Sequence, residues 1–140
     1  MIKIIRAKRK HFNTIRRMEI KTKLSLWPKW LYKALLVLTI GYGFIILYKN
    51  KPAGFLFAIP LISSVFIHQI SILPKYQKKG LGGKLLNKIL HNNKKTILIT
   101  KQKIIPWYLK KGFVKSIIPQ VLIYYNHHNL KGILSATKCV

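Results

Sequence analysis

Short apolar runs with strand-like spacing set the first expectation for this chain. MIKII alternates apolar and polar residues with a period of two, which predicts a strand over Met1–Ala7. The run at 65–73 is apolar on both faces, as expected for a buried central strand. Lys49–Pro52 has the composition of a turn. The whole pattern predicts about seven strands, the others lying at 44–48, 54–59, 96–100, 114–118 and 120–126.

Apolar residues at helical spacing predict about four helices. The first begins near His11, where Asn13 or Thr14 could cap it. Pro28 suits the first turn of the second helix. Gly112 can adopt the left-handed conformation that ends the last helix. The expected bounds are 11–26, 28–38, 80–92 and 104–111.

A length of 140 residues suits one domain. Residues 127–140 have little pattern, so we expect a domain over 1–126 followed by a tail. A membrane protein is the alternative, because 34–47 and 53–73 are both apolar. The first stretch is shorter than the ~20 residues of a spanning helix, and Pro60 with several polar residues interrupts the second. Buried strands are therefore favoured, and a membrane partner is not expected.

The N-terminus lacks the features of a secretory signal, because Met1–Arg9 has no continuous apolar segment. A basic, acid-poor N-terminus is also typical of organellar transit peptides, but the alternation favours a strand. The expected location is the cytoplasm or an organellar matrix or stroma. A single cysteine, Cys139, excludes an intrachain disulfide framework or a cysteine-based zinc site. No metal site is expected.

Charge is the most unusual feature of the composition. Lysine and arginine total 27 against a single acid, Glu19, which gives a formal net charge of +26. Such a chain repels itself unless polyanions neutralise it. RNA, a ribosome, anionic lipid or a phosphorylated cofactor are candidate partners. Compositional drift without a macromolecular partner is the alternative that the sequence leaves open.

A basic glycine-rich turn follows the expected central strand. Within 70–90 an apolar strand leads through Pro74 into Q-x-x-G-x-G, formed by Gln77, Gly80 and Gly82, and then into an amphipathic helix. Backbone N–H groups of such a turn converge at the positive end of a helix, which suits a diphosphate. The spacing matches neither the Rossmann fingerprint nor the P-loop. A plain lysine-rich loop between a strand and a helix is the alternative.

Three motifs, in this order and spacing, resemble the GCN5-related N-acetyltransferase (GNAT) family. Residues 72–82, ILPKYQKKGLG, resemble its loop for the acetyl-CoA pyrophosphate, and 107–113, WYLKKGF, resemble its later aromatic motif. Residues 51–55, KPAGF, resemble its second hairpin. The resemblance covers 2–126. It implies an α/β (α+β) fold with a mixed, mostly antiparallel twisted sheet of about seven strands, flanked by about four helices, whose fourth and fifth strands splay apart.

The resemblance also implies a site for acetyl-CoA in that splay. The backbone near Ile70, Ile72 and Leu73 would hold the pantetheine arm, and an N–H near Ile72 could stabilise negative charge on the carbonyl oxygen. The diphosphate would be held by the turn, namely by Gln77, Lys78, Lys79, Gly80, Leu81, Gly82, Gly83 and Lys84.

The resemblance assigns catalytic roles less completely. Tyr108 stands where the family often has its general acid, and packing beside the cofactor is the alternative role. Many members use a carboxylate base, but the only one here is Glu19, which we expect to be a solvated helix residue. His68 could accept the proton near neutral pH, and a hydrogen-bonded buried histidine is its alternative. Lys101 stands where many members have an asparagine.

The expected function is therefore acetyl-CoA-dependent transfer of an acetyl group to a primary amine. The amine could belong to a small molecule, a protein N-terminus or a lysine, although the charge disfavours free polyamines. The alternative is a catalytically weak or inactive GNAT-like protein with a structural role on RNA or the ribosome. The sequence leaves the acceptor, the general base and the oligomeric state open.

Overall fold

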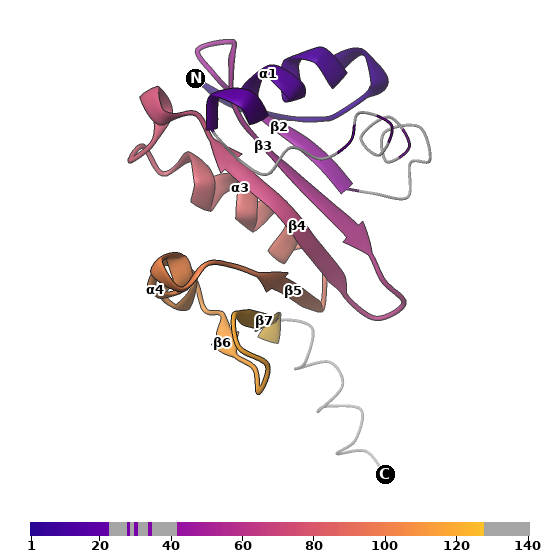
Figure 1. The fold of residues 1–140 in the computed structure, drawn as a ribbon, viewed down its shortest axis with the longest axis vertical. Coiled ribbons are helices and arrows are strands. Elements are labelled where there is room, and N and C mark those ends of the chain that lie inside the picture. The colour runs from indigo at the N-terminus through magenta and orange to yellow at the C-terminus, as the bar shows by residue number, and fades with distance from the viewer. Residues whose placement is uncertain (23–27, 29, 31–33, 35–41, 128–140) are drawn as a thin grey trace.

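The computed structural model describes residues 1–22, 28, 30, 34 and 42–127. These residues form a seven-stranded sheet in the order β1-β2-β3-β4-β5-β7-β6 (Figure 1). β4 and β5 are parallel, and the other neighbouring strands are antiparallel. The predicted mixed, mostly antiparallel sheet is confirmed. The strands are β1 (Ile2–Arg6), β2 (Tyr42–Tyr48), β3 (Lys51–Pro60), β4 (Val65–Ile72), β5 (Lys95–Ile99), β6 (Val114–Lys115) and β7 (Val121–Tyr125).

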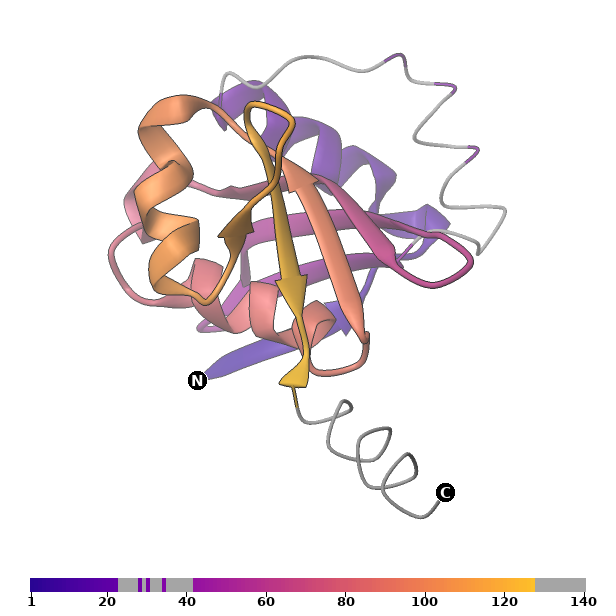
Figure 2. The same ribbon diagram turned by 90° about the horizontal axis from the view of Figure 1, so that it is seen from below.

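The α-helices of the described residues are α1 (Phe12–Thr22), α3 (Leu81–Leu90) and α4 (Ile105–Lys110). α1 and α3 cover opposite faces of the sheet (Figure 2). The predicted helix at 28–38 and the tail after residue 127 lie outside the described residues, apart from Pro28, Trp30 and Ala34. Single turns of 3₁₀ helix lie at Arg9–His11, Pro74–Tyr76 and Gln102–Ile104.

Two apolar clusters hold the helices on the sheet. Strand β3 serves both, because its side chains alternate between the faces. Phe55 and Phe57 pack against Ile15 and Met18 of α1, whereas Leu56 packs in the cluster that contains α3. Burial of each such side chain contributes roughly 1.5–3 kcal/mol. The residues that α3 buries in this way are Leu81, Leu85, Leu86, Ile89 and Leu90.

The hairpin between β2 and β3 is tighter than predicted. Lys49 and Asn50 alone form the turn, with φ of 49° and 61°. Two consecutive residues with positive φ are typical of a type I′ hairpin turn, whose twist matches that of the strands. Lys51 and Pro52 already belong to β3, so the predicted four-residue turn was wrong by these two residues.

The first helix also begins differently from the prediction. Asn13 and Thr14 lie inside α1 and do not cap it. The capping contact lies earlier, in the 3₁₀ turn Arg9–His11 that leads into α1, where the backbone N–H of Lys8 donates to Nδ1 of His11 over 2.9 Å. The imidazole nitrogen accepts the hydrogen bond that a Glu or Gln side chain at the third helical position usually accepts in a capping box.

The described residues contain no helix that is both long enough and apolar enough to cross a bilayer. They also contain no group of three or more His, Cys, Asp or Glu side chains arranged to hold a metal ion.

Candidate functional site

β4 and β5 run side by side for a short distance only. Their pairing extends from Val65 with Thr96 to Ile67 with Leu98. β4 continues to Ile72, and its other edge stays paired with β3 throughout. Beyond Ile67 the edge of β4 that faces β5 therefore has no strand partner in the described chain, and the two strands diverge (Figure 1). The predicted splay of the fourth and fifth strands is confirmed.

A β-bulge at His68 marks the point of divergence. In the ladder between β3 and β4, Ala58 pairs with Ile67 and Phe57 pairs with Gln69, so His68 is an extra residue in β4. A bulge bends its strand and increases the local twist. The bend gives a physical reason why β4 leaves β5 directly after Ile67.

The glycine-rich turn is held against the end of β4. Nε2 of Gln77 donates a hydrogen bond to the carbonyl oxygen of Ile72 over 3.0 Å. Lys78 has a φ of 59° and Gly80 a φ of 74°, both in the left-handed region that glycine tolerates and lysine rarely adopts. Gly80 directly precedes α3. The turn therefore lies at the positive end of that helix.

A cleft of about 560 Å³ lies between this turn and α4, and we call it the turn cleft. Eight of the predicted cofactor-binding residues line it: Ile70, Ile72, Gln77, Lys78, Gly80, Leu81, Gly82 and Gly83. A Cβ added at Gly82 would lie 3.6 Å from Trp107 and 3.7 Å from Ile72. The missing side chain thus leaves the backbone of α3 open to the cleft.

The other three predicted cofactor-binding residues do not line this cleft. Leu73 is buried in the cluster beneath α1, and its N–H donates to the carbonyl of Ala53 over 2.8 Å. Lys79 places its ammonium 5.7 Å from the centre of the Tyr48 ring, and Lys84 is an exposed residue of α3. Contact of these three with a cofactor stays a prediction.

Basic and aromatic residues within and on either side of α4 also line the turn cleft, and they were not predicted from the sequence. They are Lys103, Trp107 and Lys111. The ammonium of Lys111 lies 3.0 Å from the position that a Cβ of Gly83 would take, and 5.5 Å from the Trp107 ring centre. Trp107 and Lys111 are four residues apart on one helix face. That spacing within WYLKKGF is the signal that could have identified them.

Tyr108 lines the turn cleft from α4 and is only 5% exposed. Its ring makes edge contacts with Trp107 and Phe113, at centroid distances of 4.9 and 5.5 Å. Burial raises the pKa of its hydroxyl to about 12. The phenol therefore stays protonated throughout the physiological range and can act as a proton donor.

A second cleft, of about 610 Å³, lies in the gap between β4 and β5, and we call it the gap cleft. It adjoins the turn cleft, and Ile72, Lys103 and Tyr108 line both. His68 lines it and stacks on Phe57 at a centroid distance of 5.8 Å. Burial lowers the pKa of His68 to about 4, so its imidazole is neutral at pH 7.

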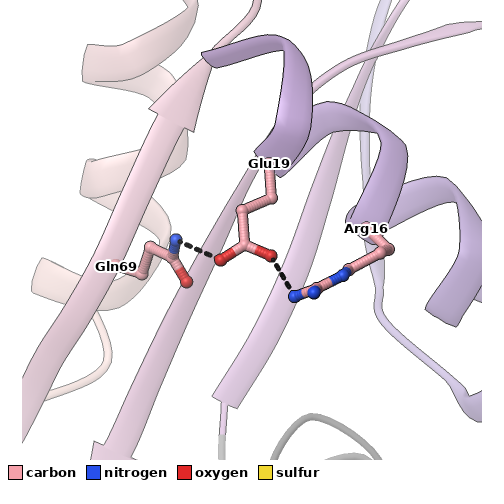
Figure 3. A network of polar contacts seen from close by, with 3 residues as sticks. All are labelled: Arg16, Glu19 and Gln69. Atoms are coloured by element: carbon pink, nitrogen blue, oxygen red, sulfur yellow. Dashed lines mark hydrogen bonds and ion pairs between the residues drawn. The ribbon is translucent and has the colours of Figure 1, made fainter. Parts of the chain in front are cut away.

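Glu19 is not the solvated helix residue that the sequence suggested. It is 0% exposed, because α1 packs against β3 and β4 at this point. Arg16 donates to its Oε2 over 3.0 Å, and Nε2 of Gln69 donates to its Oε1 over 3.5 Å (Figure 3). Gln69 also lines the gap cleft. The only acid of the chain thus contacts a residue that lines the cleft but does not line it itself.

Comparison with known families decides the classification. A sequence model of the acetyltransferase (GNAT) domain matches residues 40–115. The chain belongs to the GNAT family. No curated protein sequence matches this GNAT chain significantly.

Solved structures share the GNAT fold at low sequence identity. The ribosomal-protein-S18-alanine N-acetyltransferase from Escherichia coli has a TM-score of 0.75 at 17% identity, over 88% of this chain and 91% of that one. The PaiA N-acetyltransferase from Thermoplasma acidophilum, in complex with coenzyme A, has a TM-score of 0.73 at 14% identity, over 89% and 99%. A GNAT acetyltransferase from Brucella melitensis with acetyl-CoA has a TM-score of 0.71 at 15% identity, over 89% and 88%.

Proposed function

We propose that the chain is an acetyl-CoA-dependent N-acetyltransferase that acts on a primary amine. The main support is the gap that opens after Ile67 and Leu98, with the basic glycine-rich turn on one side and Tyr108 on the other. Acetyl-CoA supplies a thioester, whose C–S bond breaks as the C–N bond to the amine forms. Two similar GNAT structures contain coenzyme A or acetyl-CoA, which also supports the proposal.

The residues of the turn cleft fit the diphosphate of this cofactor. The backbone from Gln77 to Gly83 surrounds the start of α3, where the helix dipole favours negative charge. Lys78, Lys103 and Lys111 add positive charge around the same cleft. The unpaired edge of β4 at Ile70–Ile72 offers backbone groups to the amides of the pantetheine arm.

Tyr108 and His68 carry the proton transfers in this proposal. The amine must be neutral to attack, and the neutral imidazole of His68 can accept a proton from its nitrogen as the C–N bond forms and then release that proton to solvent. The hydroxyl of Tyr108 donates its proton to the departing sulfur and regains one from solvent. A backbone N–H near Ile72 stabilises the charge on the carbonyl oxygen.

The test is calorimetric titration with acetyl-CoA in about 0.3 M salt, where screening weakens non-specific attraction of anions to the basic surface. We expect saturable binding that Gly82→Asp weakens at least about tenfold, since the new carboxylate would repel the diphosphate. Ser63→Asp, which adds the same charge at the exposed β3–β4 turn, should bind as the wild type does. Absence of binding, or equal loss in both variants, would contradict the proposal.

A structural role on RNA or the ribosome is the second candidate function. It is favoured by the charge of +26 and by the burial of the one acid, which leaves the surface without Asp or Glu side chains to offset its lysines. The E. coli structure named above belongs to an enzyme for a ribosomal protein. Steeply salt-dependent binding to RNA without acetyl transfer would favour this role, and RNA binding that is absent at low salt would exclude it.

A further inference from the structure

The gap cleft has positive side chains and no acidic one. Lys101 and Lys103 line it at the end of β5 and are both exposed. The only Asp or Glu of the sequence is Glu19, which is 0% exposed and bound by Arg16 and Gln69 (Figure 3). Because no other acid exists in the chain, the undescribed residues cannot add a carboxylate side chain either.

This charge pattern selects against cationic acceptors. A polyamine or a lysine-rich peptide brings several positive charges, which Lys101 and Lys103 repel and no carboxylate can pair. An anionic group on the acceptor is attracted by the same two ammonium groups through charge-assisted hydrogen bonds. His68 contributes no charge at neutral pH, because burial lowers its pKa to about 4.

The same lysines help to prepare the nucleophile. A positive charge nearby disfavours the protonated form of an amine and lowers its pKa. A larger fraction of the bound acceptor is then neutral at pH 7, without a carboxylate base. The anionic group holds the acceptor in place, and the lysines favour the reactive form of its nitrogen.

We propose that the acceptor is a primary amine that also carries a carboxylate or phosphate group, and that Lys101 binds this group. The inference rests on the acetyltransferase function proposed above. Lys101 is chosen because it lines only the gap cleft, whereas Lys103 also lines the turn cleft, where the cofactor diphosphate would bind. A free small molecule and the N-terminus of an acidic peptide share this chemistry.

Acetyl transfer to matched pairs of acceptors tests the inference. One pair is glucosamine and glucosamine 6-phosphate, and a second is Ala-Asn-Gly-Gly-amide and Ala-Asp-Gly-Gly-amide, with spermidine as the cationic acceptor. Thiol release and the mass of the product are followed for each. We expect kcat/KM to be at least about tenfold higher for the anionic member. The pair with the larger ratio identifies a small molecule or a peptide as the source.

Variants separate the effect of Lys101 on acceptor binding from the effect of the positive charge of the whole protein. Lys101→Gln should reduce the preference for the anionic member about tenfold, mainly through KM, and Lys101→Arg should restore much of it. Lys88→Gln removes the same charge from an exposed position of α3 that lines neither cleft, and it should keep the preference.

Three results would overturn the inference. The first is an equal kcat/KM for the two members of each pair, and the second is a higher kcat/KM for spermidine than for the anionic acceptors. The third is a Lys101→Gln variant that changes the affinity for acetyl-CoA but not the KM for the acceptor. Acetyl-CoA binding without transfer to any of these acceptors would overturn it too. Absence of acetyl-CoA binding would instead contradict the proposed acetyltransferase function, on which this inference rests.

Discussion

Ile67 of β4 pairs with Leu98 of β5, and this is the last pair between the two strands. The next residue, His68, forms the bulge that bends β4 away. Both clefts open beyond this point, and Tyr108 lines each of them. The bulge therefore lies where the pairing of β4 with β5 ends and the gap between them begins.

Replacement of Tyr108 by phenylalanine tests its role as a proton donor. The ring contacts with Trp107 and Phe113 do not need the hydroxyl, so Tyr108→Phe should fold normally. We expect kcat to fall about 100-fold while KM for acetyl-CoA stays nearly unchanged. Steady-state kinetics measures both. An unchanged kcat would assign Tyr108 a packing role only.

His68 should make the protein less stable in acid. Burial lowers its pKa from 6.5 to about 4, so the unfolded chain binds the proton more readily than the folded one. Its contribution to stability is fully present above about pH 6.5 and is lost as the pH falls toward 4, by at most about 3 kcal/mol. Urea unfolding at several pH values measures this loss.

His68→Phe serves as the control for the acid effect, because it keeps a ring to stack on Phe57 and removes the titration. Most of the slope between pH 6.5 and 4 should disappear in this variant. Burial, Lys10 and Lys8 lower the pKa of His11, so a slope of the same sign remains from that residue. Because Glu19 is the only acidic side chain, the titration of carboxylates adds little to the change in stability over this pH range. An unchanged slope in His68→Phe would show that His68 is not the source.

Gly54 and Gly82 should respond differently to alanine. A Cβ at Gly54 would come within 2.4 Å of the carbonyl oxygen of Ser71, so Gly54→Ala must push β3 and β4 apart and should cost about 1–3 kcal/mol of stability. At Gly82 the nearest atom is 3.6 Å away, so Gly82→Ala should fold as well as the wild type. It should nevertheless weaken acetyl-CoA binding, because the methyl group enters the turn cleft. Equal unfolding midpoints for the two variants would contradict the observed pairing.

Removal of the Glu19 side chain should destabilise the packing of α1 on β4. Glu19→Ala leaves the partly buried Arg16 and the buried Gln69 without this acceptor, and we expect a loss of about 2 kcal/mol. Glu19→Gln keeps the size and one acceptor oxygen, so it should lose less. Chemical unfolding followed by circular dichroism measures both. Equal losses would mean that shape alone matters at this position.

Much of the fold could be predicted from sequence, because its signals are local. The apolar run of β4 and the glycines around Gly80 mark the central strand and the start of α3. The prediction of Asn13 or Thr14 as the cap was wrong because a 3₁₀ turn, Arg9–His11, precedes α1 and puts both residues inside the helix, and His11 makes the capping contact of that turn. No propensity rule gives histidine that role.

The burial of Glu19 could not be predicted, since it depends on contacts with Gln69 across fifty residues of chain. Helical periodicity alone places a charged residue in solvent by default. The bulge at His68 is equally invisible in sequence, because an extra residue in a long apolar strand leaves no local signal. Lys111 was missed for a related reason, as it reaches Gly83 from another helix.

Binding of coenzyme A along the gap and the glycine-rich turn can be measured by a nuclear magnetic resonance titration of the ¹⁵N-labelled protein with coenzyme A, with inorganic pyrophosphate as the control anion. We expect coenzyme A to shift the backbone amides of Ile70–Ile72 and Gln77–Gly83 most strongly, and pyrophosphate to shift those of the turn but not those of Ile70–Ile72. Two results would contradict binding at this site. In one, the largest shifts belong to amides that lie outside both clefts. In the other, either ligand shifts the amides of all exposed lysines of the described chain equally.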